Sequence, residues 1–287
     1  MNVKKYENEL LYMPSKWCKR MEPTVVVNNH IDTIRLVSER VKKSNFCKRS
    51  DIKYGPGDLQ LLDIYESNLL HCNTFVYIHG GYWQELNKDI SAYCVEPLIN
   101  AGIRVIVTGY DLAPNVTLNM IVDEIHQLLS YLVNNLEYNN IWLGGHSAGA
   151  HLAACMILPT IQEFSSEVKG FILISGIYDL APLLKTTINN TLHLNELTCL
   201  ELSPVCFLKK HLTNISWCGK CFLVSAENDS PAFKQQSTKF AQFLTFHGLE
   251  VIEECINGVD HFDIVENLAN DDYILTRRII NLILNKS

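Results

Sequence analysis

A serine at a predicted strand-to-helix turn is the residue in this sequence best placed for covalent chemistry. An apolar run from Ile141 ends in Gly145-His146-Ser147-Ala148-Gly149, and a helical pattern at 150–158 follows, stopped by Pro159. Small residues on either side of the serine let strand and helix approach closely, which lifts the serine to the tip of the turn. Free N–H groups at the helix N-terminus favour a developing anion there. We therefore predict that Ser147 is a nucleophile; a glycine-rich turn with an incidental serine is the alternative.

A serine hydroxyl needs a base to remove its proton, and a third group must orient that base. In enzymes with this turn, the acid and then the histidine follow the serine along the chain. Glu227 and Asp229 both follow a predicted strand at 221–225. We select Asp229, because a helix begins directly after it and fixes the turn. The glycine-containing loop after the last predicted strand presents His261, which we predict to be the base.

A developing oxyanion needs preorganised hydrogen-bond donors. One is predicted to be the N–H of Ala148, directly after the nucleophile. The others are expected from the loop His79-Gly80-Gly81-Tyr82, which follows a predicted strand at 74–78. Glycines allow the backbone N–H groups of Gly80, Gly81 and Tyr82 to face a substrate. A plain glycine turn is the alternative here.

The composition limits the classes of partner. With 287 residues, 47% of them apolar and 19% charged, the chain fits a single domain over 1–287 with an ample core. The net charge of −7, without a basic stripe, argues against nucleic acid and anionic membranes. We find neither a signal peptide nor an apolar run of ~20 residues, and ten scattered cysteines are typical of reduced thiols. A cytoplasmic protein is expected, without a cofactor and without a metal, since no His/Cys/Asp spacing suggests one.

Strands and helices are predicted to alternate around these residues. A polar arm at 1–24, a helix at 28–43 and a hairpin at 51–65 come first; strands at 74–78, 103–108, 141–144, 169–175, 221–225 and 250–255 then alternate with helices at 87–100, 117–134, 150–158 and 230–247 and a tail from about 264. This alternation predicts an α/β fold with a mostly parallel twisted sheet and helices on both faces. Functional residues are then expected at the carboxyl ends of the strands. The alternation lapses at 176–216, which we interpret as a cap or lid insertion over the site.

Six sequence stretches, taken together, are shared by far fewer protein families than the serine turn alone. They are His79-Gly80-Gly81-Tyr82-Trp83-Gln84, Tyr110-Asp111-Leu112-Ala113-Pro114 with Val116-Thr117-Leu118, Gly145-His146-Ser147-Ala148-Gly149-Ala150-His151-Leu152, Ser175-Gly176-Ile177-Tyr178-Asp179-Leu180, Asp229-Ser230-Pro231 and Asp260-His261-Phe262-Asp263. In these stretches, which span about residues 75–265, the chain resembles the kynurenine formamidase (arylformamidase) family of the α/β-hydrolase superfamily. The N-terminal arm also looks similar. Ala113 and Ala232 depart from the family pattern, but both lie outside the predicted catalytic residues.

The resemblance implies an α/β-hydrolase fold and hydrolysis of N-formyl-L-kynurenine to L-kynurenine and formate, a step of tryptophan breakdown. Ser147 would attack the formyl carbon with His261 as base, giving a formyl-enzyme. His261 would then protonate the aniline nitrogen and later activate water. Asp229 would hold the imidazole tautomer.

The pocket is predicted to be aromatic. We expect Tyr82, Trp83 and Tyr178 to narrow the site around the small formyl group and to stack on the substrate ring. A general carboxylesterase of the HGG type is the alternative enzyme, since it shares the catalytic residues and differs in its pocket. A catalytically silent binding module is the second alternative, against which the presence of all three catalytic residue types argues. The oligomeric state stays open, with a homodimer among the alternatives.

Overall fold

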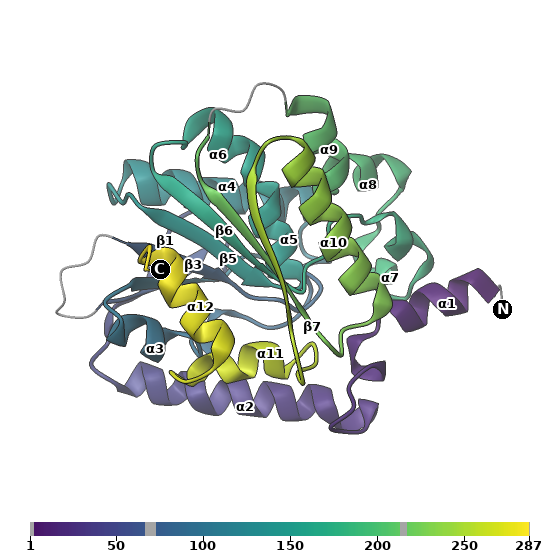
Figure 1. Ribbon diagram of the computed structural model, residues 1–287, viewed down its shortest axis with the longest axis horizontal. Helices are drawn as coiled ribbons and strands as arrows, with labels where there is room; N and C mark the ends of the chain where they lie inside the picture. Colours follow the sequence, from purple (N-terminus) through teal and green to yellow (C-terminus); the bar gives the residue numbers. More distant parts are fainter. Residues whose placement is uncertain (1–2, 67–72, 213–216, 287) are drawn as a thin grey trace.

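The computed structural model describes residues 3–66, 73–212 and 217–286 (Figure 1). In this part of the chain eight strands form one sheet of order β1-β2-β4-β3-β5-β6-β7-β8. Strand β2 pairs antiparallel with β1 and β4, and every other pair is parallel. The strands are β1 (Cys47–Lys53), β2 (Leu61–Tyr65), β3 (Thr74–Ile78), β4 (Arg104–Thr108), β5 (Ile141–His146), β6 (Val168–Ile174), β7 (Lys220–Ala226) and β8 (Glu250–Ile256). The predicted mostly parallel α/β sheet is confirmed.

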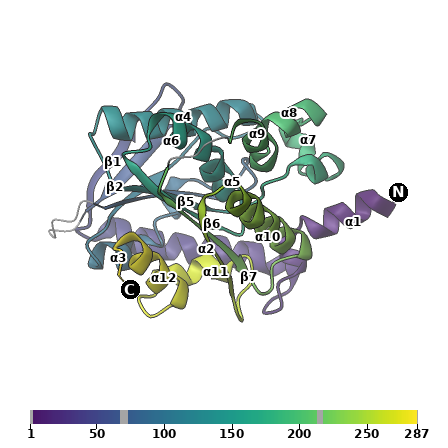
Figure 2. The same ribbon diagram turned by 45° about the horizontal axis from the view of Figure 1, so that its top comes forward.

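Helices cover both faces of the sheet, as the two views show (Figures 1 and 2). One face carries α4 (Leu118–Asn134), α5 (Ala148–Cys155), α6 (Ile157–Glu163), α7 (Asn189–Leu192), α8 (Glu196–Leu202), α9 (Pro204–His211) and α10 (Pro231–Phe246). The other face carries α2 (Pro23–Lys43), α3 (Val95–Asn100), α11 (Asp263–Glu266) and α12 (Ile274–Ile283). Helix α1 (Val3–Leu11) lies beside α10 at the end of the sheet where β7 ends. Because both faces are covered, β3 and β5 are buried along their whole length.

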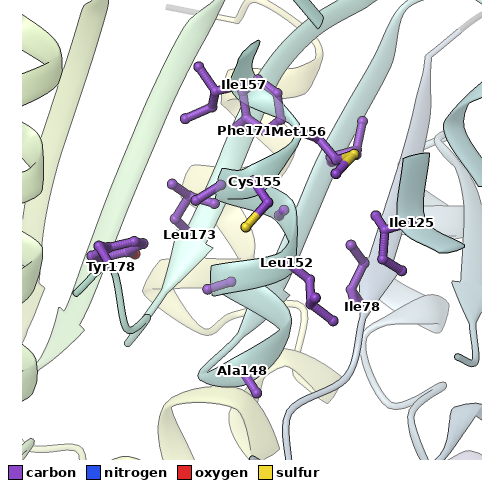
Figure 3. Close-up of a cluster of buried hydrophobic side chains, with 14 of the residues drawn as sticks. Ile78, Ile125, Ala148, Leu152, Cys155, Met156, Ile157, Phe171, Leu173 and Tyr178 are labelled. Atoms are coloured by element: carbon purple, nitrogen blue, oxygen red, sulfur yellow. The ribbon is translucent and has the colours of Figure 1, made fainter. Parts of the chain in front are cut away.

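Helix α5 begins directly after the predicted nucleophile and lies in the core (Figure 3). Every residue of α5 is buried. Leu152 of α5 lies beside Ile78 of β3 and Ile125 of α4, and Cys155 lies near Leu173 of β6. Burial of apolar surface on all sides holds this helix, and with it the turn at its N-terminus, in a fixed position.

Two predicted helices are shorter in the structure than expected, and a proline explains each case; separately, the helix expected at 28–43 begins five residues earlier, at Pro23. The helix expected at 87–100 is a 3-10 turn η2 (Lys88–Ile90) followed by α3, which begins only at Val95. Pro97 lacks an N–H and its ring would clash with the carbonyl four residues earlier, so it must lie in the first helical turn. The helix expected at 150–158 is divided: α5 ends at Cys155, and Pro159, which has no N–H to donate to the carbonyl of Cys155, lies in the first turn of α6.

The segment expected to be an insertion runs between β6 and β7. It forms η3 (Ala181–Lys185), α7, α8 and α9; residues 213–216 of the predicted range lie outside the described residues. Helix α8 contacts α4, and α9 contacts α5. Most of the segment therefore packs on the helices of one face of the sheet. Separately, the helices of the described ranges include none that is long and apolar enough to cross a membrane.

Candidate active site

Ser147 lies between the end of β5 and the start of α5, in a backbone conformation that serine seldom adopts. Its φ is 55° and its ψ is −116°, which costs on the order of 1–3 kcal/mol and persists only where the surroundings impose it. A side chain on Gly149 would clash with the carbonyl oxygen of Ile78, and one on Gly145 would clash with the backbone of Gly149. The two glycines therefore allow strand and helix to meet closely enough to impose the turn.

His261 is held by a buried carboxylate. Its Nδ1 lies 2.7 Å from Oδ1 of Asp229, and both side chains are almost fully buried. Oδ2 of Asp229 accepts hydrogen bonds from the hydroxyl of Ser175 at 2.5 Å and from the N–H of Ala226 at 2.8 Å. Because a carboxylate oxygen accepts, this bond assigns the donor role to Nδ1 of His261; in the neutral imidazole, Nε2 then carries the lone pair. This tautomer can take a proton from a serine hydroxyl.

His146, between the first glycine of the motif and Ser147, packs against His261. The two ring centroids are 4.5 Å apart, and the ring of Phe233 lies 4.7 Å from His261 on another side. Burial lowers the pKa of His146 well below its ordinary value, so the ring is neutral near pH 7. Its Nε2 has no hydrogen-bond partner among the described residues. His146 is not among the site residues predicted from the sequence, although its position next to Ser147 was a signal.

The glycine loop approaches the serine directly. A methyl group on Gly80 would lie 3.4 Å from Cβ of Ser147 and 3.0 Å from the carbonyl oxygen of His146. Gly81 and Tyr82 have φ angles of 97° and 50°, and both line the same cavity as Ser147. Within the described ranges, no backbone or side-chain acceptor is bonded to the N–H groups of these two residues. The loop thus brings free donors close to the serine, as an oxyanion site requires.

A neighbouring aromatic pair stiffens the glycine loop. The ring of His79 stacks on Tyr110 with centroids 4.3 Å apart, and the Tyr110 hydroxyl donates to the carbonyls of His79 and Gly80 at 3.0 and 3.3 Å. The Tyr82 hydroxyl donates to the carbonyl of Tyr12 at 2.6 Å. The loop is therefore tied both to the segment after β4 and to the N-terminal arm.

Ser147 and His261 face a common cavity of ≈250 Å³. The rest of its wall consists of Glu9, Tyr12, Met13, Pro14 and Ser15 from the N-terminal arm, Val27, His30 and Ile31 from α2, Gly81, Tyr82, Glu85 and Leu86 from the glycine loop, Thr187 and Ile188 from the 176–216 segment, and His146 and Phe262. The wall is mostly apolar, and its charged residues are Glu9 and Glu85. The N-terminal arm supplies more of it than the 176–216 segment does.

Two predicted pocket residues do not line this cavity, and the expectation that they stack on a substrate is corrected. Trp83 is fully buried and packs edge-on against His151, with centroids 4.9 Å apart. Tyr178 is 1% exposed and stacks on Phe240 at 4.3 Å; Figure 3 shows it in the core cluster. Both rings gain more by burial beneath the site than by facing solvent. Tyr82 alone of the three lines the cavity.

The sequence did not predict that the N-terminal arm, residues 1–24, forms part of the site. The Ser230 hydroxyl donates to the carbonyl of Leu11 at 2.5 Å, and Gln236 donates to the Tyr12 hydroxyl at 2.6 Å. Arg20 lies 2.8 Å from the carboxylate of Asp260, next to His261. These contacts span more than 200 residues of sequence. The aromatic residues of the arm indicated that it packs on the body, but no local pattern showed where.

Residues 75–263 match the model of a family described as having the alpha/beta hydrolase fold. The esterase of the archaeon Pyrobaculum calidifontis superposes with a TM-score of 0.70 over 99% of this chain and 96% of its own, at 18% identity, which shows the fold alone. Kynurenine formamidase of Danio rerio is 35% identical over 98% of this chain and 97% of its own length. That of Drosophila melanogaster is 31% identical over 94% of each. The chain belongs to the α/β-hydrolase family and, within it, to the kynurenine formamidases.

Proposed function

We propose that the protein hydrolyses N-formyl-L-kynurenine to L-kynurenine and formate, with Ser147 as nucleophile, His261 as general base and Asp229 as the group that orients it. The observation that carries this proposal is the bond from His261 to Asp229, with His261 and Ser147 on one cavity wall. The identity of the substrate is inferred from the formamidases to which the chain is similar over nearly its full length.

The proposed reaction has two halves. Ser147 Oγ attacks the formyl carbon and gives its proton to Nε2 of His261, and the N–H groups of Ala148 and the Gly80–Tyr82 loop stabilise the oxyanion. The C–N bond then breaks, the imidazolium protonates the departing aniline nitrogen, and L-kynurenine leaves. His261 then deprotonates a water molecule, which attacks the formyl ester. As the ester C–O bond breaks, the imidazolium returns its proton to Ser147 Oγ, and the formic acid released loses its proton to solvent as formate. Atoms and protons balance without a cofactor.

The cavity wall supports an aromatic amino acid as the substrate. Apolar side chains and the rings of Tyr12, Tyr82 and Phe262 suit an aryl ketone. The wall has two carboxylates, Glu9 and Glu85, and its described residues include neither Lys nor Arg. That charge favours the α-ammonium group of the substrate inside the cavity and its carboxylate toward solvent.

We further propose that the chain acts as one domain in the cytoplasm on this free small molecule. The 176–216 segment would cap one side of the cavity, through Thr187 and Ile188. Thr187 is bonded through its N–H to the carboxylate of Glu9 at 2.8 Å. The cap and the N-terminal arm would therefore close the cavity together.

The experiment that tests the function compares kcat/KM for N-formyl-L-kynurenine and for p-nitrophenyl acetate in the wild type and in Ser147→Ala. We expect a strong preference for the formamide, and a loss of about 10⁴-fold or more in the variant. Good turnover of the ester with none of the formamide would support the carboxylesterase alternative instead. Unchanged activity of Ser147→Ala would rule out the proposed nucleophile.

A further inference from the structure

Arg20 joins the N-terminal arm to the loop that carries His261. It lies between η1 (Pro14–Lys16) and α2. Its Nε is 2.8 Å from Oδ2 of Asp260 and 3.5 Å from Oδ2 of Asp263. Its Nη2 is 3.0 Å from both carboxylate oxygens of Glu266. One guanidinium thus contacts three carboxylates that lie one residue before, two after and five after His261.

Asp260 and Asp263 hold the backbone of this loop around His261. Oδ1 of Asp260 accepts from the N–H groups of Phe262 at 2.8 Å and Asp263 at 3.1 Å. Oδ1 of Asp263 accepts in return from the N–H of Asp260 at 2.6 Å. His261 therefore lies inside a closed turn of reciprocal side-chain bonds. Arg20 anchors that turn, since Asp260 is 3% exposed and Arg20 is the cation that pairs with it.

The charges around His261 make this anchor electrostatically significant. Burial acts to raise the pKa of Asp260, but hydrogen bonds from Cys18 and Arg20 lower it below its ordinary value. Burial, with Asp260 close by, raises the pKa of Asp263 to about 6. The pKa of Arg20 is raised, because its acidic partners outweigh the effect of burial. Arg20 thus balances a strongly acidic loop.

Groups from other elements also face this region. Asp229 bonds to His261, the neutral ring of His146 packs on it, and Glu9 and Glu85 line the same cavity. On the far side of the loop His30 of α2 lies 2.8 Å from Oε1 of Glu266. Among the groups named here, Arg20 carries a permanent positive charge, whereas most of the others are carboxylates. Carboxylates near an imidazole favour its protonated form, which cannot act as a base.

We propose that Arg20 is a positioning residue for His261, which holds the 260–266 loop through its carboxylates and offsets their negative charge at the imidazole. This inference rests on the proposed role of His261 as the base. It makes the N-terminal arm part of the catalytic apparatus through a contact that does not touch the substrate.

The test separates geometry from charge with two substitutions at one position. Arg20→Gln removes the positive charge and also the planar guanidinium. Arg20→Lys keeps the charge but loses the guanidinium geometry that binds two carboxylates at once. We expect kcat/KM to fall about tenfold or more in Arg20→Gln, with the acid limb of its pH profile moved to higher pH by about half a unit or more. Arg20→Lys should keep the wild-type acid limb and recover part of kcat. Arg35→Gln is the matched control, since Arg35 pairs with Asp32 on the exposed side of α2.

The limb is measured on N-formyl-L-kynurenine and, independently of the substrate, as the pH dependence of Ser147 labelling by a fluorophosphonate. If the wild type is labelled and the acid limb of the pH profile is not shifted in Arg20→Gln, the proposed role of Arg20 is contradicted, while the proposed catalytic residues stand. No labelling of the wild type would overturn the proposed catalytic residues, and this inference with them. If Arg20→Gln does not fold, Glu266→Gln decides. That variant keeps the hydrogen-bond acceptor but removes a negative charge, so its acid limb should move to lower pH; an unmoved limb would contradict the proposal.

Discussion

The hydroxyl of Ser175 donates a hydrogen bond of 2.5 Å to Oδ2 of Asp229, on the opposite side of the carboxylate from His261. Ser175 directly follows β6, has a φ of 47° and is fully buried. A buried carboxylate needs such donors, because an unpaired charge inside a protein is costly. Ser175 therefore fixes the direction in which Asp229 faces His261.

Replacing Ser175 by Ala removes this bond and leaves the buried carboxylate one donor short. We expect kcat to fall about 10- to 100-fold, equivalent to about 1.4–2.8 kcal/mol. The free energy of unfolding should fall by about 1–3 kcal/mol, measured by urea denaturation. Ser237→Ala is the matched control, since Ser237 on α10 is as buried and its hydroxyl has no partner among the described residues. Equal effects of the two substitutions on kcat would contradict the role of Ser175.

Replacing Gly80 by Ala tests how closely the glycine loop approaches Ser147. The added methyl would lie 3.0 Å from the carbonyl oxygen of His146 and 3.4 Å from Cβ of Ser147, so the loop must shift outward. We expect kcat to fall about 10- to 1,000-fold, because oxyanion donors act only over short distances. Gly248→Ala is the control: Gly248 has a φ of 87° but open space around it, so stability should fall while kcat remains. A Gly80→Ala enzyme of normal kcat would exclude this loop from the oxyanion site.

Replacing Trp83 by Ala tests whether this residue belongs to the core or contacts the substrate. Because it is fully buried, Trp83→Ala should lower the free energy of unfolding by about 3–5 kcal/mol. The folded fraction should lose activity on a small ester and on N-formyl-L-kynurenine to a similar degree. Urea denaturation and parallel assays of both substrates measure this. A stable variant with a raised KM for the aromatic substrate alone would place Trp83 in the pocket after all.

Buried neutral histidines should make the protein lose stability in mild acid. Burial lowers the pKa of His151 to about 4, whereas in the unfolded chain it lies near 6.5. Between pH 6.5 and pH 4, the imidazole of His151 is therefore protonated in the unfolded chain but not in the folded protein. Stability is therefore complete above that pH and falls as the pH drops toward 4, by about 2–3 kcal/mol for this residue. We expect urea unfolding to show this slope.

His151→Gln should make the slope shallower without removing it, because burial also lowers the pKa of His79 to about 4. His126→Gln is the control, since His126 lies on the exposed side of α4 and pairs with Glu163. An identical slope in wild type and His151→Gln would contradict the assignment of a buried neutral ring.

The sequence by itself determined the order of strands and helices and the sharp turn at Ser147. Apolar periodicity and glycine spacing are local properties, so α4 begins at Leu118, within one residue of its predicted start, and Ser147 lies in a strained turn between strand and helix. The sequence also placed Asp229 and His261 after neighbouring strands. In a parallel sheet the carboxyl ends of β7 and β8 lie side by side, so the two residues meet at 2.7 Å.

Only the tertiary structure decided which side chains form the cavity. Trp83 and Tyr178 lie next to motif residues but face the core, whereas Tyr12 and Arg20, far away in sequence, reach the site. An aromatic side chain can cover either a core or a pocket at similar local cost, so sequence proximity does not choose between them. That choice depends on packing between elements that are distant along the chain, and such packing has no local pattern.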